Sequence, residues 1–281
     1  MLESRKRSVT VRGITLSYID WGENGPPLLL LHGDMRTARS WDAVARELHP
    51  RFHVLSLDAR GHGDSDWTPR GYTTDDKVED LAGFLQELGV REIVGVGHSS
   101  GASVLAFEVR REPGVFTRLV LLEPIVVLDE TWQRRFASRA GLPRRTWASR
   151  RELHRYLEGH ETARRWRADV LRDIVEHETL ELPDGSIDMK WAAATFNPED
   201  RLGDHYDLRP LFRDPVVPTL FVASQDRRPD FEGIVSIADE TPDFHTLIMS
   251  ESGHNMYMER PDAVARAVEA FANGETLPPV I

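Results

Sequence analysis

The stretch that decides the fold is Gly97-His98-Ser99-Ser100-Gly101, which follows the apolar run Glu92-Ile93-Val94-Gly95-Val96 and precedes a helical pattern from Ala102 to Arg111. A short apolar run that passes through glycine directly into a helical pattern predicts a sharp strand-to-helix turn. Ser99 would take strained backbone angles there, and the glycines two positions away on either side would leave room for its crowded neighbours. The turn either presents a reactive hydroxyl or is a glycine-rich turn in which Ser99 caps the helix.

The other apolar runs predict the sheet to which this turn belongs. They are continuous rather than alternating, which is typical of strands buried on both faces, and helical patterns such as Glu79 to Leu88 separate them. The runs are Leu28–Leu31, Val54–Leu57, Ile93–Val96, Leu119–Leu122, Leu220–Val222 and Thr246–Met249. The sequence therefore predicts an α/β fold with a mostly parallel, doubly wound sheet. Alternating residues on both sides of Gly13 predict an antiparallel hairpin at its edge.

One segment, from about Val126 to Leu211, breaks the alternation of strands and helices. It is helical in pattern, and Gly141-Leu142-Pro143 and Leu182-Pro183-Asp184-Gly185 interrupt it. We interpret residues 126–211 as an inserted helical cap and residues 1–125 and 212–281 as one core domain. Four of the seven tryptophans lie in this cap, which would give it much of the large apolar surface available to a ligand.

Composition excludes several classes of function. The chain has 281 residues and a formal net charge of −11, which disfavours binding to nucleic acids or anionic membranes. It has no cysteine, so disulfides, thiolate nucleophiles and cysteine metal sites are excluded. No pair of histidines has metal-ligand spacing on one helix face and no glycine-rich phosphate loop is present, so we expect no metal or nucleotide cofactor. A polar N-terminal stretch and the absence of an apolar run of 18 residues lead us to expect a cytoplasmic protein.

Three more motifs occur at the ends of predicted strands. They are Leu31-His32-Gly33, Asp58-Ala59-Arg60-Gly61-His62-Gly63-Asp64-Ser65 and Ser252-Gly253-His254-Asn255. With the serine turn, they make the chain resemble the α/β-hydrolase family over nearly its whole length. The resemblance implies that Ser99 is a nucleophile and that His254 is the base that takes its proton.

The resemblance also implies a carboxylate that orients His254. Asp226, which follows the run Leu220–Val222, lies where the family usually keeps this acid, and it completes the order serine, acid, histidine. Glu123, at the end of another predicted strand, is the alternative because some relatives take their acid from that position. We expect Asp226 to be the acid and keep Glu123 as its rival.

Backbone amides would hold the negative oxygen that develops during acyl transfer. The resemblance assigns them to Ser100 and Asp34, with Met35 as a one-position alternative to Asp34. The carboxylate of Asp34 is unusual, since many relatives carry an aromatic or apolar residue there. A negative charge would hinder an oxyanion unless it turns away or is paired, and the nearby Arg36 is one candidate partner.

These observations predict an enzyme that hydrolyses a carboxylic ester or lactone of a small to medium, partly apolar molecule through an acyl-serine intermediate. Carbon-carbon bond hydrolysis, perhydrolysis of the haloperoxidase kind and cofactor-free oxygenation are alternatives on the same fold. A ligand-binding receptor on this scaffold is a further alternative outside enzymes. The sequence leaves open whether the protein is a monomer or a homodimer.

Overall fold

The centre of the fold is an eight-stranded sheet in the order β1-β2-β4-β3-β5-β6-β11-β12. It is seen in a computed structural model that describes residues 4–22, 24–201 and 203–281. The strands are β1 (Arg5–Val11), β2 (Ile14–Asp20), β3 (Pro27–Leu31), β4 (His53–Leu57), β5 (Ile93–His98), β6 (Phe116–Leu122), β11 (Thr219–Ser224) and β12 (Phe244–Met249). β1 and β2 form an antiparallel hairpin and β2 is antiparallel to β4, whereas all other neighbours are parallel. The predicted mostly parallel sheet and its edge hairpin are confirmed.

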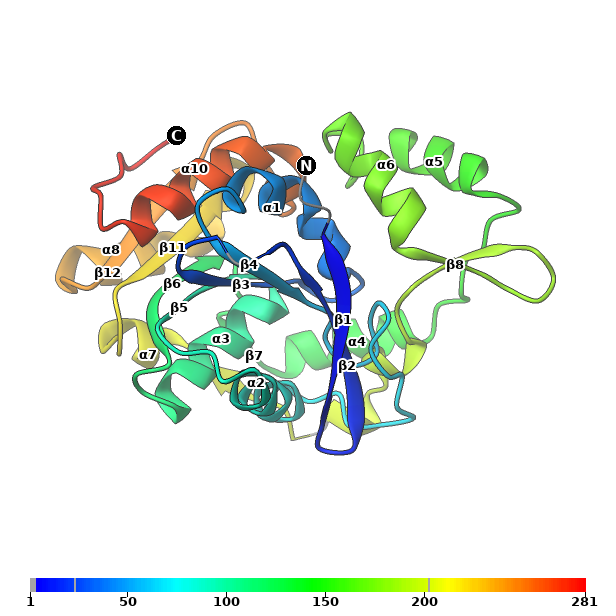
Figure 1. The fold of residues 1–281 in the computed structure, drawn as a ribbon, viewed down its shortest axis with the longest axis horizontal. Coiled ribbons are helices and arrows are strands. Elements are labelled where there is room, and N and C mark those ends of the chain that lie inside the picture. The colour runs from blue at the N-terminus through cyan, green and yellow to red at the C-terminus, as the bar shows by residue number, and fades with distance from the viewer. Residues whose placement is uncertain (1–3, 23, 202) are drawn as a thin grey trace.

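Helices cover both faces of this sheet, as Figure 1 shows. α1 (Asp42–Leu48) and α10 (Pro261–Ala272) pack together on one face. The other face carries α2 (Thr74–Leu88), α3 (Ser100–Arg111), α7 (Arg209–Arg213) and α8 (Glu232–Glu240). Successive side chains of a strand point to opposite faces, so alternate leucines of β3 enter the two cores. This two-sided burial is the physical reason for the continuous apolar runs.

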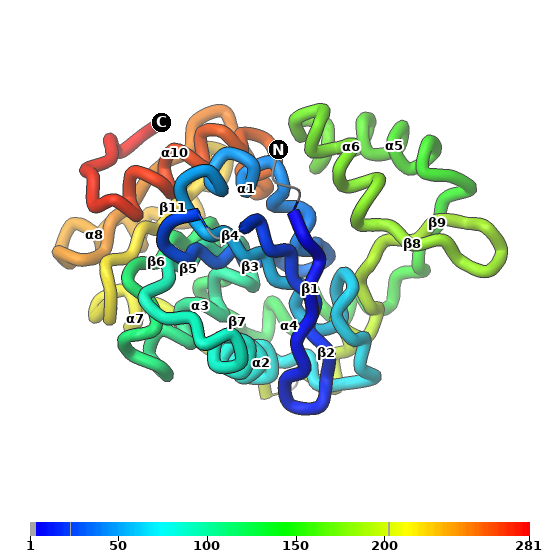
Figure 2. Tube along the Cα trace, in the orientation of Figure 1, coloured from blue at the N-terminus to red at the C-terminus, as the bar shows by residue number. Residues whose placement is uncertain are grey.

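The segment between β6 and β11 is largely helical, but it also contains two short antiparallel pairings that the sequence did not predict. Its helices are α4 (Glu130–Ala140), α5 (Arg150–Gly159) and α6 (Ala168–His177). β7 (Val127–Leu128) pairs with β10 (Tyr206–Asp207), and β8 (Thr179–Glu181) pairs with β9 (Ile187–Met189). In Figure 2, α5, α6, β8 and β9 lie together at one side of the molecule. That residues 126–211 act as a cap domain with these boundaries stays a prediction.

The remaining elements are short. They are the 3-10 helices η1 (Ala38–Trp41), η2 (Ala193–Phe196), η3 (Glu199–Arg201) and η4 (Gln225–Phe231), together with α9 (Met256–Glu259). Within the described residues, no helix combines the length and the apolar character needed to cross a membrane.

The central strand β3 offers a direct test of the two-sided core. Leu30 is fully buried, and we expect Leu30→Ala to lower the free energy of unfolding by about 2–5 kcal/mol because it removes apolar contacts and leaves a cavity. Leu142→Ala, at a leucine that is 64% exposed, is the matched control and should change it by less than about 0.5 kcal/mol. Urea denaturation of the three proteins measures both values. Equal losses in the two variants would contradict the assignment of β3 to the core.

Candidate active site

Ser99 lies on a strained turn between β5 and α3, with φ 53° and ψ −122°. Residues with a side chain rarely adopt such angles, and they cluster at functional sites when they do. A Cβ at Gly97 would lie 2.6 Å from the backbone of α3, and one at Gly101 would lie 2.5 Å from the carbonyl oxygen of His32. Glycine is therefore required at both positions, as the sequence predicted. The amide of Ser99 donates to the carbonyl oxygen of Leu122, 2.9 Å away, which fixes the turn to the end of β6.

The carboxylate that contacts His254 is that of Glu123. Nδ1 of His254 lies 2.6 Å from Oε2 of Glu123, and because a carboxylate accepts hydrogen bonds, Nδ1 carries the proton. Nε2 of the neutral ring is then an acceptor. Glu123 directly follows β6, has a φ of 43°, and is only 1% exposed. Its other oxygen, Oε1, accepts hydrogen bonds from the amide and the hydroxyl of Ser224 at 2.8 and 2.5 Å.

Arg227 adds a positive charge to this pair, which the sequence analysis did not identify. Its Nη1 donates to Oε2 of Glu123 at 2.9 Å and lies 3.1 Å from Nδ1 of His254. Burial alone would raise the pKa of the Glu123 carboxyl group. The hydrogen bond and charge of His254, the Ser224 hydroxyl and the Arg227 guanidinium outweigh burial and lower that pKa to about 2. Glu123 is therefore an ionised acceptor at neutral pH.

The structure does not place Asp226 against His254, although the sequence led us to expect that it orients this histidine. Its side chain is 53% exposed and accepts a hydrogen bond from Nη2 of Arg165 at 2.8 Å. The physical reason lies in the local backbone. β11 continues to Ser224, and η4 starts at the next residue, so that Asp226 belongs to a surface ion pair while Glu123 reaches His254 from the neighbouring strand.

His98, the residue before the serine, packs against His254. Their ring centroids are 4.5 Å apart, and Nε2 of His98 donates to the carbonyl oxygen of His254 at 2.8 Å. Burial holds the pKa of His98 well below its ordinary value, so the ring is neutral. His98 thus ties the loop that carries His254 to the serine turn.

The two candidate oxyanion residues, Ser100 and Asp34, have amides without an acceptor among the described residues. The alternative, Met35, uses its amide to donate to Nε2 of His62 at 3.2 Å. His62 can accept because burial lowers its pKa to about 4 and its Nδ1 donates to a backbone carbonyl. A Cβ on Gly33 would lie 2.9 Å from the Cβ of Ser99, so this loop and the serine turn are adjacent. The geometry therefore favours Asp34 over Met35.

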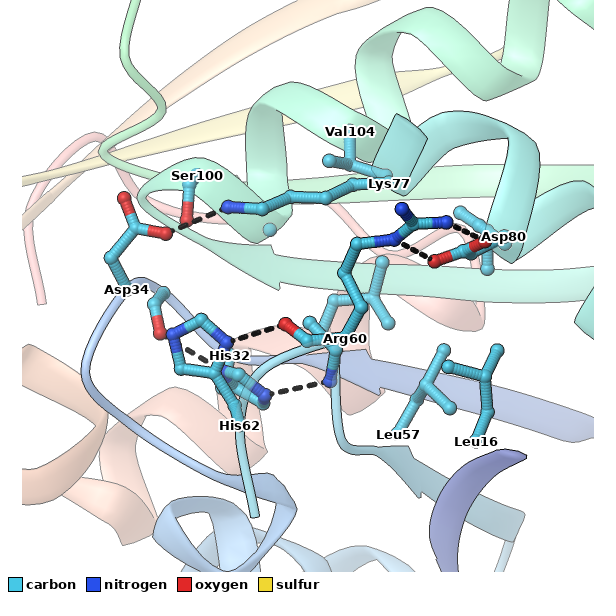
Figure 3. Close-up of a pocket in the computed structure, with 15 residues that line it drawn as sticks. Leu16, His32, Asp34, Leu57, Arg60, His62, Lys77, Asp80, Ser100 and Val104 are labelled. Carbon is cyan, nitrogen blue, oxygen red and sulfur yellow. Dashed lines mark hydrogen bonds and ion pairs between the residues drawn. The ribbon is translucent and has the colours of Figure 1, made fainter. Parts of the chain in front are cut away.

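The carboxylate of Asp34 is paired, but its partner is Lys77 and not Arg36. Nζ of Lys77 lies 2.8 Å from Oδ1 of Asp34, and Figure 3 shows the lysine extending from α2 toward Asp34 and Ser100. Arg36 instead lies 3.1 Å from Oε2 of the buried Glu178, at the end of α6. The sequence carried a signal for Lys77, since it occupies the same helical stripe as the buried apolar residues of α2.

Ser99 and His254 lie at the same edge of the sheet, but no hydrogen bond joins their side chains in the described part of the chain. Such bonds are often long in the absence of substrate and tighten when it binds. The side chain of His254 is 37% exposed and can therefore be reached by a ligand. In residues 4–22, 24–201 and 203–281, no group of three or more histidine and carboxylate side chains is gathered in a way that could hold a metal ion.

Comparison with known proteins identifies the family to which the chain belongs. A model of the Alpha/beta hydrolase family matches residues 28–267. The chain belongs to the α/β-hydrolase family. It is 24% identical over 266 residues to 2-(acetamidomethylene)succinate hydrolase of Mesorhizobium japonicum, which covers 94% of each chain. It is also 36% identical over 106 residues to a bifunctional esterase/perhydrolase of Acinetobacter calcoaceticus, 37% of this chain and 38% of that one.

Solved structures of α/β-hydrolases share the fold. The crystal structure of E-2-(acetamidomethylene)succinate hydrolase superposes with a TM-score of 0.83 at 23% identity and covers 96% of this chain and all of the other. At this identity the superposition establishes the fold, whereas the chemistry of this α/β-hydrolase depends on its own site residues.

The lowered pKa of Glu123 predicts how the free energy of unfolding depends on pH. The pKa of Glu123 is about 2 in the folded protein and lies below the ordinary 4.5. The ionised carboxylate therefore contributes to the free energy of unfolding above pH 4.5, and this contribution is lost as the pH falls toward 2. Between pH 6 and pH 3, we expect the wild type to lose about 2 kcal/mol more stability than Glu123→Gln. Urea denaturation across this range measures the difference.

Asp226→Asn is the matched control for this experiment. It removes a carboxylate from an exposed ion pair, which contributes little to stability, so its curve should follow that of the wild type. Parallel curves for the wild type and Glu123→Gln would contradict the buried ionised state of Glu123.

Proposed function

We propose that this α/β-hydrolase cleaves a carboxylic ester or a lactone through an acyl intermediate on Ser99. The observation that carries the proposal is the 2.6 Å hydrogen bond between His254 and the buried Glu123, beside a serine held on a strained turn. A serine hydroxyl is a weak nucleophile at neutral pH and needs a base whose tautomer is fixed. Glu123 fixes the tautomer of His254 that has its acceptor on Nε2.

The proposed reaction has two halves. In the first, Oγ of Ser99 attacks the carbonyl carbon while Nε2 of His254 takes the hydroxyl proton. Collapse of the tetrahedral intermediate breaks the bond to the leaving oxygen, which receives that proton from Nε2. The alcohol of an ester then departs, whereas the new hydroxyl group of a lactone stays on the acyl chain. In the second half, His254 takes a proton from water as the water attacks the acyl carbon. It returns that proton to Oγ of Ser99 as the bond between the acyl carbon and Oγ breaks and the carboxylic acid is released. Glu123 stabilises the positive imidazolium in both halves.

The amides of Ser100 and Asp34 would hold the oxyanion. Both are free of other acceptors among the described residues, and Ser100 is the first residue of α3, whose N-terminal end carries partial positive charge. Donors fixed in advance favour the transition state because they need no reorganisation as the charge develops.

An apolar cluster next to these residues supports a partly apolar substrate. Its members come from the loop after β6, from the oxyanion loop and from the segment between β6 and β11, and several of them are partly exposed. They are Ile125, Leu128, Phe136 and Phe196, packed with Met35, Trp132, Trp191 and Tyr206. The names of relatives agree with acyl chemistry, since one is an esterase and perhydrolase and another is a hydrolase of a substituted succinate.

A panel of p-nitrophenyl esters from acetate to octanoate tests the nucleophile, and a short lactone tests the ring-opening reaction. We expect the wild type to turn over at least one of these substrates and Ser99→Ala to be slower by about 10³-fold or more while still folded. His254→Ala should fall to a similar level, because residues that act as one unit are not additive. A wild type no faster than Ser99→Ala would contradict the proposed function.

The same assay distinguishes the two candidate acids. Glu123→Gln should lower kcat by about 10²-fold or more, because the amide no longer supports the positive imidazolium. Asp226→Asn, the matched variant at the exposed position, should keep essentially wild-type kcat. The reverse pattern would assign the acid to Asp226.

A further inference from the structure

A buried cluster of four charged residues lies behind the proposed oxyanion loop. It consists of Asp34, Lys77, Arg201 and Asp204, whose side chains are 13%, 8%, 3% and 5% exposed. Lys77 binds Asp34 at 2.8 Å, and Nη1 of Arg201 lies 3.6 Å from Oδ2 of Asp204. The cluster thus joins α2, the loop after β3 and the segment that leads back from α6 to the core.

Burying the ammonium group of Lys77 at this position costs free energy. The buried face of α2 on which it lies carries Val78, Leu81 and Phe84 as well as the polar Thr74 and Asp80, and a buried ammonium group loses its hydration. Replacing a buried ion pair by apolar groups is often neutral or stabilising. Stability alone therefore gives no reason for the pair of Lys77 and Asp34, and a role in the chemistry of the neighbouring site would give one.

The negative charge of Asp34 beside the proposed oxyanion hole gives Lys77 such a role. Its amide is one of the two proposed oxyanion donors, so its carboxylate belongs to the residue that meets the developing negative charge. Asp34, Lys77 and Ser100 also line one cavity of about 30 Å³, shown in Figure 3. Like charges that share a poorly hydrated space repel strongly, and an isolated Asp34 carboxylate would oppose the charge that the two amides have to stabilise.

We propose that Lys77 is a positioning residue for acyl transfer. Its ammonium group neutralises the Asp34 carboxylate, so that this carboxylate does not repel the oxyanion held by the two amides. This inference rests on the proposed function. Lys77 acts through Asp34 and does not touch the reacting atoms. The ion pair leaves the amide of Asp34 available while cancelling the field of its side chain.

The proposal has a pH signature. Burial would raise the pKa of Asp34, and Lys77 together with Arg201 and His62 outweighs burial and holds that pKa well below its ordinary value. The charged and titratable groups that face the pair from the packed elements are Lys77 on α2, Arg201 on η3, Asp204, Tyr206 on β10, and His32 and His62 in the loops after β3 and β4. Without the ammonium group, the carboxyl group of Asp34 would ionise at higher pH than it does in the wild type.

The experiment is a double-mutant cycle on the most active substrate, with Lys77→Met, Asp34→Asn and the double variant. We expect Lys77→Met to lower kcat by about 10-fold or more at pH 8 with little change in KM, because the repulsion acts on the transition state. The ratio of its rate to the wild-type rate should rise as the pH falls, since protonation of Asp34 removes the charge. In the Asp34→Asn background, Lys77→Met should have little effect and no such pH dependence.

Lys190→Met is the matched control. It removes a lysine that pairs with Asp64 at 2.7 Å outside this cluster, and it should leave kcat unchanged. Thermal unfolding of each variant verifies that it is folded at the assay temperature.

The outcomes separate this proposal from the proposed function. A wild type no faster than Ser99→Ala overturns the proposed function and, with it, the role of Lys77. If the wild type is active but Lys77→Met slows the reaction by the same factor in the wild-type and Asp34→Asn backgrounds, only the role of Lys77 is overturned. Equal loss at all pH values would likewise show that Lys77 serves the packing of α2 and not the charge of Asp34.

Discussion

The proposed site depends on the hydrogen bond between the buried carboxylate of Glu123 and the imidazole of His254. This hydrogen bond joins the end of β6 to the loop after β12, across the intervening strand β11. The Ser224 amide and hydroxyl on β11 fix one carboxylate oxygen, and the ring and Arg227 contact the other. An ionised carboxylate buried without these partners would be costly, so the four groups have to be present together.

Backbone strain accompanies this arrangement at three strand ends. Met35, Ser99 and Glu123 all have positive φ angles, between 43° and 64°, in the turns after β3, β5 and β6. Conformations of this kind cost of order 1–3 kcal/mol each and persist only where the surrounding structure enforces them. The buried parallel strands provide that enforcement. Each strained residue carries or adjoins a group of the proposed site, consistent with a rigid sheet that holds reactive loops at its carboxyl edge.

Much of the fold and part of the site could be predicted from the sequence, because both are recorded in local patterns. Continuous apolar runs indicated strands buried on both faces, and glycines on both sides of Ser99 indicated a crowded turn. The acid could not be decided in this way, since Glu123 and Asp226 both follow strands, and the choice depends on where β11 ends and which direction each side chain takes. The pairing of Asp34 with Lys77 joins residues 43 positions apart, and Arg227 approaches Glu123 from η4. Such contacts depend on tertiary packing, which a local pattern does not encode.

The role of Glu123 in activating Ser99 is tested by the reaction of the protein with diethyl p-nitrophenyl phosphate, which modifies an activated serine and releases p-nitrophenol as it does so. We expect the wild type and Asp226→Asn to release a single equivalent rapidly, the modification to lie on the peptide containing Ser99, and Glu123→Gln to react far more slowly. Modification at another residue, or a Glu123→Gln variant that reacts at the rate of the wild type, would contradict this role.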